Sequence, residues 1–143
     1  MCVKQVSVIL ENVPGMFLSV SECLARESIN IRAISVADIS GISTVRFVTD
    51  NPVKTVGVLR SNGYNVQEND VIAVEIPDHP GAMRAVLKPL TELNINVLYF
   101  YTYLGRGESG QPIVIIGVDR TEEAIEALKR NWLHMFGNEI YSL

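Results

Sequence analysis

The distribution of apolar and polar residues predicts a mixed order of strands and helices in the first half of the chain. β-Branched residues indicate strands, whereas Phe17, Val20 and Leu24 recur at the spacing of one helix face. Ser40 and Gly41 suit a turn between two strands. The predicted elements are strands at residues 3–10, 29–39, 43–48 and 64–67, a helix after Gly15 that also buries Cys23, and a helix capped by Asp50 or Asn51 that buries Val53, Val56 and Leu59 and stops at Asn62 and Gly63.

The second half repeats this order. The predicted elements are strands at residues 71–76, 96–104, 113–118 and 139–142, a helix from Pro80 with Met83, Val86, Leu90 and Leu93 inward, and a helix over 121–131. Pro89 falls inside the first of these helices, where it removes a backbone hydrogen bond and should kink the axis.

The two halves also share residues in register. Residues 10–31 align with residues 76–97 at an offset of 66, with six identities in 22 positions: Pro14/Pro80, Gly15/Gly81, Val20/Val86, Leu24/Leu90, Ile29/Ile95 and Asn30/Asn96. A longer loop at residues 105–112 raises the offset to 69. The chain therefore reads as a tandem repeat of two modules, residues 1–69 and 70–143, joined by little more than residues 68–70. Each βαββαβ order predicts an α+β, ferredoxin-like module, an antiparallel sheet with helices on one face, and exchange of an edge strand between modules stays open.

Composition narrows the class of protein. Apolar residues make up 48% of the chain, charged residues 20%, and the net charge is −4 without a basic run, which argues against a nucleic-acid partner. We find neither a membrane span nor a secretion signal, so we expect a cytoplasmic protein. Cys2 and Cys23 lack metal-ligand spacing, and we expect no metal and no cofactor. Such apolar, small modules should bury surface against each other or against another chain, most simply in a homodimer.

One strand is rich in tyrosine. Alternation places Tyr99, Tyr101 and Tyr103 on one face, and Leu98 and Phe100 suit the face that packs on the helices. The equivalent residues of the first half are Ala33, Ser35 and Ala37. We favour a contact between sheets or subunits for the tyrosines, with a ligand wall or a base-stacking platform as the alternatives.

The turn that follows each first strand carries a resemblance. Residues 11–15, Glu-Asn-Val-Pro-Gly, precede Ile-Asn-Ile at 29–31, and residues 77–81, Pro-Asp-His-Pro-Gly, precede Ile-Asn-Val at 95–97. This pattern resembles the ACT domain, a small regulatory module that senses amino acids, and the two copies cover the whole chain. The resemblance implies a stand-alone pair of ACT modules, without a catalytic domain, that binds an amino acid and regulates a partner enzyme.

The chemistry of the turn agrees with such a role. A helix that begins near Pro14 or Pro80 has free backbone N–H groups and a positive dipole end, which attract a carboxylate. The alternative is an ordinary cap, in which Asn12 and Asp78 satisfy those amides, while Asn30 and Asn96 merely shape a turn and His79 is solvated. The candidate ligand-binding residues are Glu11, Asn12, Val13, Pro14, Gly15, Met16, Asn30 and Ile31 in the first module and Asp78, His79, Pro80, Gly81, Ala82, Asn96 and Val97 in the second.

Three other functions compete with a regulatory sensor. A structural subunit would oligomerise through the same fold without a ligand. An enzyme is disfavoured, since the chain has no nucleophile beside a base and no metal cluster, and the glycines at 105, 107 and 110 match the spacing of a dinucleotide loop but join two strands. An RNA-binding sheet would need basic and aromatic strands that are missing outside residues 99–103.

Overall fold

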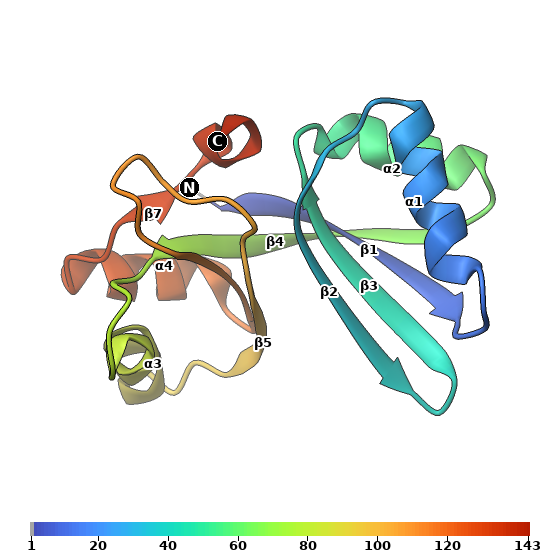
Figure 1. Ribbon diagram of the computed structural model, residues 1–143. Helices are drawn as coiled ribbons and strands as arrows, with labels where there is room; N and C mark the ends of the chain where they lie inside the picture. Colours follow the sequence, from blue (N-terminus) through green and yellow to red (C-terminus); the bar gives the residue numbers. More distant parts are fainter. Residues whose placement is uncertain (1) are drawn as a thin grey trace. The chain divides into compact units, whose positions relative to one another are not determined.

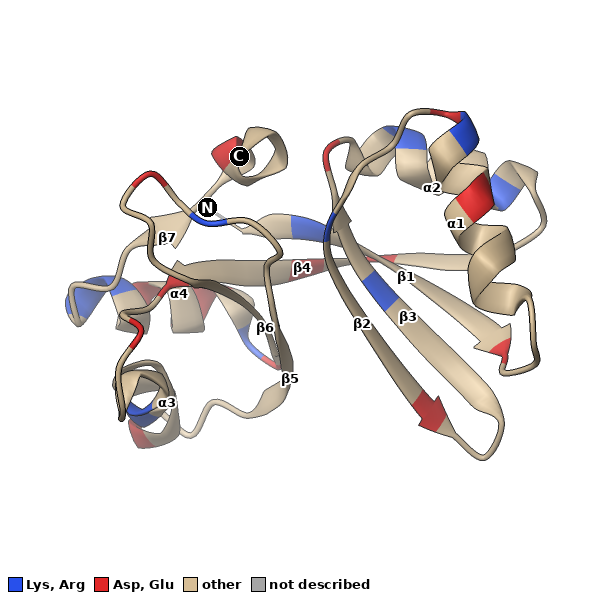
Figure 2. Ribbon diagram, viewed as in Figure 1, with Lys and Arg blue, Asp and Glu red and all other residues tan. Residues whose placement is uncertain are grey.

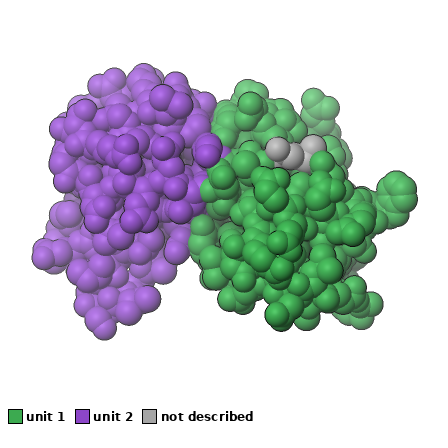
Figure 3. All heavy atoms as spheres, turned by 180° about the vertical axis from the view of Figure 1, so that it is seen from behind, with its two compact units in different colours: residues 1–3, 70–143 green, residues 4–69 purple. Residues whose placement is uncertain are grey.

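The computed structural model describes residues 2–143, which form two compact units. Lys4–Asn69 make one unit, and Cys2 and Val3 join Asp70–Leu143 in the other (Figure 3). The α+β fold and the antiparallel sheets predicted from the sequence are confirmed in both units. Among the described residues, no helix is both long enough and apolar enough to span a membrane.

The unit of residues 4–69 packs two helices on one face of a sheet (Figure 1). Its elements are β1 (Val3–Glu11), α1 (Met16–Arg26), β2 (Ile31–Ile39), β3 (Ile42–Thr49), α2 (Pro52–Ser61) and the first part of β4 (Asn65–Glu75). The strand order is β2-β3-β1-β4, with β3 antiparallel to both β1 and β2. The core lies between the helices and the sheet and centres on Leu24, Phe47 and Leu59.

The second unit repeats this plan. Its elements are the rest of β4, α3 (Ala82–Glu92), β5 (Val97–Thr102), β6 (Ile113–Val118), α4 (Thr121–Arg130), β7 (Met135–Phe136) and the 3₁₀ helix η1 (Asn138–Ser142). β6 is antiparallel to β4 and β5, and β7 pairs with β4, so the order β5-β6-β4-β7 matches that of the first unit. The core centres on Ile72, Leu90 and Leu128.

The charges of α4 suit its direction. Glu122 and Glu123 lie in the first turn and Lys129 and Arg130 in the last, and Figure 2 shows the acidic and basic residues along this helix. Each sign therefore faces the helix end of opposite partial charge, which stabilises the helix.

The linker predicted at residues 68–70 and the strand predicted at residues 139–142 are both wrong. Residues 64–67 and 71–76 do not form separate strands around a linker, because β4 continues from Asn65 to Glu75. No glycine or proline interrupts this stretch, so its polar residues stay in extended backbone. Residues 139–142 are not a strand but lie in η1, where the Ile140 N–H donates to the Gly137 carbonyl at 3.1 Å. The closing strand is instead β7.

Some predicted inward residues are exposed. Val53, in the first turn of α2, is 80% exposed, because Thr55, Val56 and Leu59 form the buried face of that helix. Phe17, near the start of α1, is 40% exposed, and Leu93, which directly follows α3, is 43% exposed. Pro89 lies inside α3 as predicted, and the helix runs on to Glu92.

The tyrosine strand has the predicted faces but not the predicted burial. Phe100 pairs with the core residue Ile116, which places it on the helix side, and Tyr99 and Tyr101 pair across from Gly117 and Ile115 on the other face. Phe100 and Leu98 are nevertheless exposed. A register shift between Val97 and Tyr99 lets Val97 fill the core and leaves Leu98 in the irregular position.

Candidate functional site

Each unit contains the predicted glycine turn at the start of a helix. Gly15 has φ +91° and precedes α1, and Gly81 has φ +84° and precedes α3. This left-handed backbone costs an L-residue roughly 1–2 kcal/mol, whereas glycine adopts it freely. A Cβ added at either glycine would meet no atom within 4 Å, so the space in front of both turns is open.

The two turns have the same backbone hydrogen bonds. In the first, the Val13 N–H donates to Glu11 O at 3.1 Å and the Met16 N–H to Val13 O at 3.3 Å. In the second, the His79 N–H donates to Pro77 O at 3.1 Å and the Ala82 N–H to His79 O at 3.2 Å. The duplication has therefore kept the turn geometry although four of the residues at 11–16 differ from those at 77–82.

Neither of these two helices is capped by a side chain. The Asn12 amide donates to the Asp38 carboxylate at 3.2 Å instead of accepting from α1. By contrast, α2 has an ordinary cap, in which Asn51 Oδ1 accepts from the Lys54 N–H at 3.1 Å. α1 and α3 thus each begin at a glycine. Because this glycine has no side chain, a ligand can approach the positive end of the helix.

The turns differ in what holds them. The Asn12 N–H donates to Gly41 O, at the β2–β3 tip, at 2.8 Å. The Asp78 N–H donates to Gln111 Oε1 at 3.3 Å, and the Ile76 N–H to Pro112 O at 3.0 Å, so the longer loop at 105–112 supports the second turn. His79 Nδ1 lies 2.9 Å from its neighbour's carbonyl, Pro80 O.

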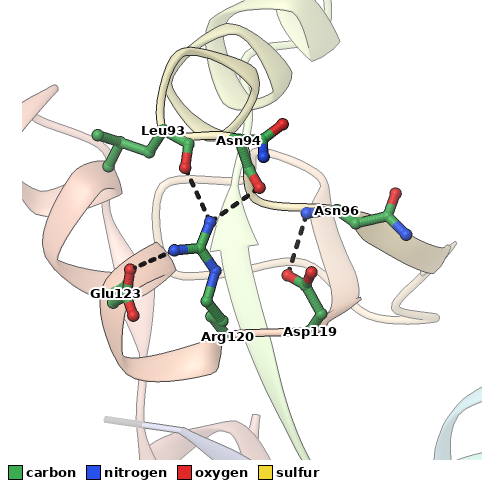
Figure 4. Close-up of polar contacts among 6 residues, drawn as sticks. All are labelled: Leu93, Asn94, Asn96, Asp119, Arg120 and Glu123. Carbon is green, nitrogen blue, oxygen red and sulfur yellow. Dashed lines mark hydrogen bonds and ion pairs between the residues drawn. The ribbon is translucent and has the colours of Figure 1, made fainter.

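The predicted asparagines lie at the starts of β2 and β5. The Asn30 N–H donates to Asp50 Oδ1 at 3.0 Å, and the Asp50 N–H donates back to Asn30 O at 3.0 Å. The second unit repeats the pair: the Asn96 N–H donates to Asp119 Oδ1 at 3.0 Å (Figure 4), and the Asp119 N–H donates back to Asn96 O at 3.2 Å. Both asparagine side chains are exposed. The backbone of Asn30 therefore ties the start of β2 to the end of β3, and the backbone of Asn96 ties the start of β5 to the end of β6.

In the second unit the Arg120 guanidinium binds next to the Asn96–Asp119 pair. Arg120 donates to Leu93 O and Asn94 O, both at 2.8 Å, and forms an ion pair of 2.7 Å with Glu123 (Figure 4). It thereby satisfies carbonyls at the negative end of α3. In the first unit Lys54 Nζ serves the same end of α1 through Glu27 O at 2.7 Å. A hollow of about 410 Å³ lies here, lined by Thr91, Asn94, Ile95, Asn96 and Asp119.

The structure separates residues that the sequence analysis grouped. Gly15 and Asn30 lie beyond opposite ends of α1, whose 11 residues span about 16 Å at 1.5 Å per residue. Gly81 and Asn96 are separated in the same way by α3. Within a unit, the candidate residues therefore form two corners: Glu11 to Met16, or Asp78 to Ala82, at the turn, and Asn30 with Ile31, or Asn96 with Val97, at the strand start. Ile31 and Val97 pack against the cores.

The aspartates of the strand-start corner are missing from the sequence prediction. Asp50 was predicted as one of two caps for α2, but Asn51 is the cap and Asp50 binds the backbone of Asn30. The signal that finds both aspartates is the offset of 69, which aligns Asp50 with Asp119.

Asp119→Ala is expected to lower the free energy of unfolding by about 1–2 kcal/mol, because it removes the charged acceptor of the Asn96 N–H. Urea unfolding followed by circular dichroism measures the loss. Glu126→Ala is the control, since the Glu126 side chain makes an exposed ion pair of 3.8 Å with Lys129, and its loss should change stability by less than about 0.5 kcal/mol. Equal effects of the two substitutions would contradict a structural role for Asp119.

A second hollow, of about 500 Å³, contains the one carboxyl group with a clear pKa shift among the described residues. It is lined by Glu75, Glu108, Ser109, His134, Phe136, Glu139 and Leu143. The pKa of Glu139 is lowered, first by a hydrogen bond from the backbone of Gly137 and then by its own backbone, with His134 acting in the same direction.

A carboxyl whose pKa is lowered by folding stabilises the folded state above its ordinary pKa, and this contribution disappears as the pH falls through the lowered value. Glu139→Gln should therefore reduce stability slightly at pH 7 and leave it unchanged in acid below that pKa. Thermal unfolding at the two pH values measures the difference. A difference of the same size at both would show that Glu139 acts by something other than its charge.

Comparisons with known proteins agree with this architecture. The model of a family described as "ACT domain pair" matches residues 1–142. The crystal structure of protein BT0572 from Bacteroides thetaiotaomicron is similar with a TM-score of 0.91 and 29% identity, over 100% of this chain and 98% of that chain. No curated protein matches the sequence.

Regulatory subunits of aspartate kinase share the fold. The subunit from Thermus thermophilus, in its ligand-free form, matches with a TM-score of 0.64 and 15% identity over 90% of this chain and 92% of that chain. The subunit from Thermus flavus matches with a TM-score of 0.61 and 17% identity over the same shares. Because the match to the family model covers nearly the whole sequence, this chain belongs to the ACT domain pair family.

Proposed function

We propose that this protein is a cytoplasmic regulatory sensor that binds an amino acid at its glycine turns and controls a separate enzyme of amino-acid metabolism. The observation that carries the proposal is the pair of matched, uncapped helix starts at Gly15 and Gly81. The other two α-helices start differently: α2 is capped by Asn51, and α4, which also has no side-chain cap, follows Arg120 with φ −138° instead of a left-handed glycine.

The chemistry of an amino acid suits these turns. Its carboxylate would accept hydrogen bonds from the backbone amides at the start of α1 or α3, where the helix dipole favours negative charge. Its ammonium group needs an acceptor nearby, and each turn has an acidic residue: Asp38, which holds Asn12 at 3.2 Å, and the exposed Asp78. The proposed site is therefore a small dipolar one, with backbone donors on one side and a carboxylate on the other.

The family and the fold shared with aspartate kinase regulatory subunits support a regulatory role. Binding can change the state of the protein only if the amino acid has different affinities for two conformations or assemblies. We propose that the ligand-bound turns shift such an equilibrium, and that the partner enzyme responds to it. A purely structural subunit would keep the same assembly whether or not amino acids are present.

Isothermal titration of the intact chain with each of the twenty amino acids tests the proposal. We expect at least one to bind with saturable heat, and its D-enantiomer and its carboxamide, which lacks the carboxylate, to bind at least tenfold more weakly. Absence of heat and of any thermal stabilisation with all twenty would contradict the sensing function. Equal binding of the carboxamide would contradict recognition by the helix amides.

A further inference from the structure

Trp132 occupies the left-handed position that follows each α-helix, where the other three helices have the small residues Ser28, Gly63 and Asn94. It follows α4 with φ +63°, and its N–H donates to Lys129 O at 3.0 Å while the Leu133 N–H donates to Leu128 O at 3.2 Å. At the end of α2, Gly63 has φ +83° and the same two bonds, to Arg60 O at 3.0 Å and from Tyr64 to Leu59 O at 3.2 Å. The two helix ends are therefore equivalent, and only one carries a large side chain.

Nothing within the described chain covers this tryptophan. Trp132 is 95% exposed, and it is the only tryptophan of the sequence. A bulky residue in left-handed backbone is strained, and an exposed indole leaves apolar surface in water. Gly63 shows that this kind of helix end forms without a bulky residue and without an exposed ring. The indole of Trp132 is therefore a candidate for contact with another molecule.

A hollow lies next to Trp132 in the same unit. It measures about 220 Å³, lies between α3 and α4, and is lined by Pro89, Glu92, Leu93, Ala127, Arg130 and Asn131. Leu93, which the helix pattern predicts to be buried, is 43% exposed here. Since an apolar cavity of about 150 Å³ holds a benzene molecule, this hollow has room for an indole ring.

The hollow also has the chemistry that an indole requires. Pro89, Leu93 and Ala127 supply apolar wall, the Glu92 carboxylate can accept the indole N–H, and the Arg130 guanidinium can stack on the ring. Asn131, which lines the hollow, directly precedes Trp132. The Trp132 side chain and the hollow therefore lie on the same surface of the unit.

We infer that this surface joins two copies of the chain, with Trp132 of each copy inserted into the hollow of the other. A two-fold axis makes such an exchange reciprocal, because a projection beside its own receptor is self-complementary under that symmetry. Under such an axis the exposed Glu92 and Arg130 side chains of one copy would meet side chains of opposite charge on the other, in addition to the partners Lys88 and Glu126 that they have within the chain. Within its unit the hollow lies at the end of α3 opposite to Gly81, so the proposed contact does not use that glycine turn.

The fluorescence of Trp132 gives a direct test, because no other tryptophan contributes. With increasing protein concentration, the emission maximum should move to shorter wavelength in step with a doubling of mass in sedimentation or light scattering. Trp132→Gly should keep the circular dichroism spectrum, as Gly63 supports the same helix end, and should weaken association at least tenfold. A monomer with unchanged emission, or a dimer that Trp132→Gly does not weaken, would overturn the inference.

Complementary variants test the reciprocal contact. Leu93→Lys keeps the tryptophan but blocks the hollow, whereas Trp132→Gly keeps the hollow. Each should fail to associate alone, and a mixture should form a dimer with one intact contact. The matched control is Leu98→Lys, because Leu98 is also exposed, at 57%, but lies on β5 outside the hollow. A mixture that associates no better than its components, or an equal effect of Leu98→Lys, would contradict the proposed exchange.

Discussion

Leu24→Ala and Leu90→Ala are each expected to lower the free energy of unfolding by about 2–5 kcal/mol, because each leaves a cavity in a packed core. The two leucines hold the same position of the repeat, at 1% and 0% exposure, one in each unit's core. A unit of this size has little stability to spare, so either loss is a large fraction of the total. Urea unfolding measures the size of the effect.

Hydrogen exchange measured by mass spectrometry shows which unit each of these two substitutions destabilises. Leu24→Ala should speed exchange first in residues 4–69, and Leu90→Ala first in residues 70–143, because each core cluster belongs to one unit. Leu18→Ala, on α1 with 62% exposure, is the control and should cost less than about 0.5 kcal/mol. A core substitution that costs no more than this control would contradict the packing described for that unit.

Gly15→Ala and Gly81→Ala are expected to weaken amino-acid binding at least tenfold, about 1.4 kcal/mol. Neither new methyl group meets an atom within 4 Å, so the cost comes from the left-handed backbone alone. Alanine there favours a different φ, which would tilt the first amides of α1 or α3 away from the carboxylate. Titration calorimetry with the best-binding amino acid measures the change.

Gly63→Ala separates binding from stability. Gly63 has φ +83° and equally open surroundings, but it follows α2 instead of preceding a helix. All three substitutions should cost about 1 kcal/mol of stability, and only those at Gly15 and Gly81 should weaken binding. Weakening by Gly63→Ala as well would mean that general destabilisation, not the turn, explains the loss of affinity.

The fold is predictable from the sequence because the repeat compares the chain with itself. Six shared residues fix the register of both modules, and most element boundaries agree within a few residues. The failures arise where local signals are weak. Polar residues at 68–70 read as a linker, although nothing in them stops a strand. Apolar residues after Gly137 read as a strand, although only Ile140 of η1 is buried.

The candidate site is predictable only in part. The two glycine turns follow from proline and glycine at fixed spacing before a helical pattern. The sequence motif contains both the glycine and the asparagine, but it does not give the distance between them. That distance is set by the helix, because Gly15 and Asn30 lie at opposite ends of α1. The bonds from the Asn30 N–H to Asp50 and from the Asn96 N–H to Asp119 join positions 20 and 23 residues apart, beyond the reach of a local pattern.

The most direct measurement of the central claim is a titration of the ¹⁵N-labelled chain with the bound amino acid, followed by nuclear magnetic resonance. We predict that the largest saturable shifts fall on the backbone amides of Gly15 and Phe17 or of Gly81 and Met83, because a carboxylate at the helix start accepts hydrogen bonds from them, whereas the Met16 and Ala82 N–H groups already donate within the turns. Saturable shifts that leave both groups of amides unchanged would contradict an amino-acid site at the glycine turns.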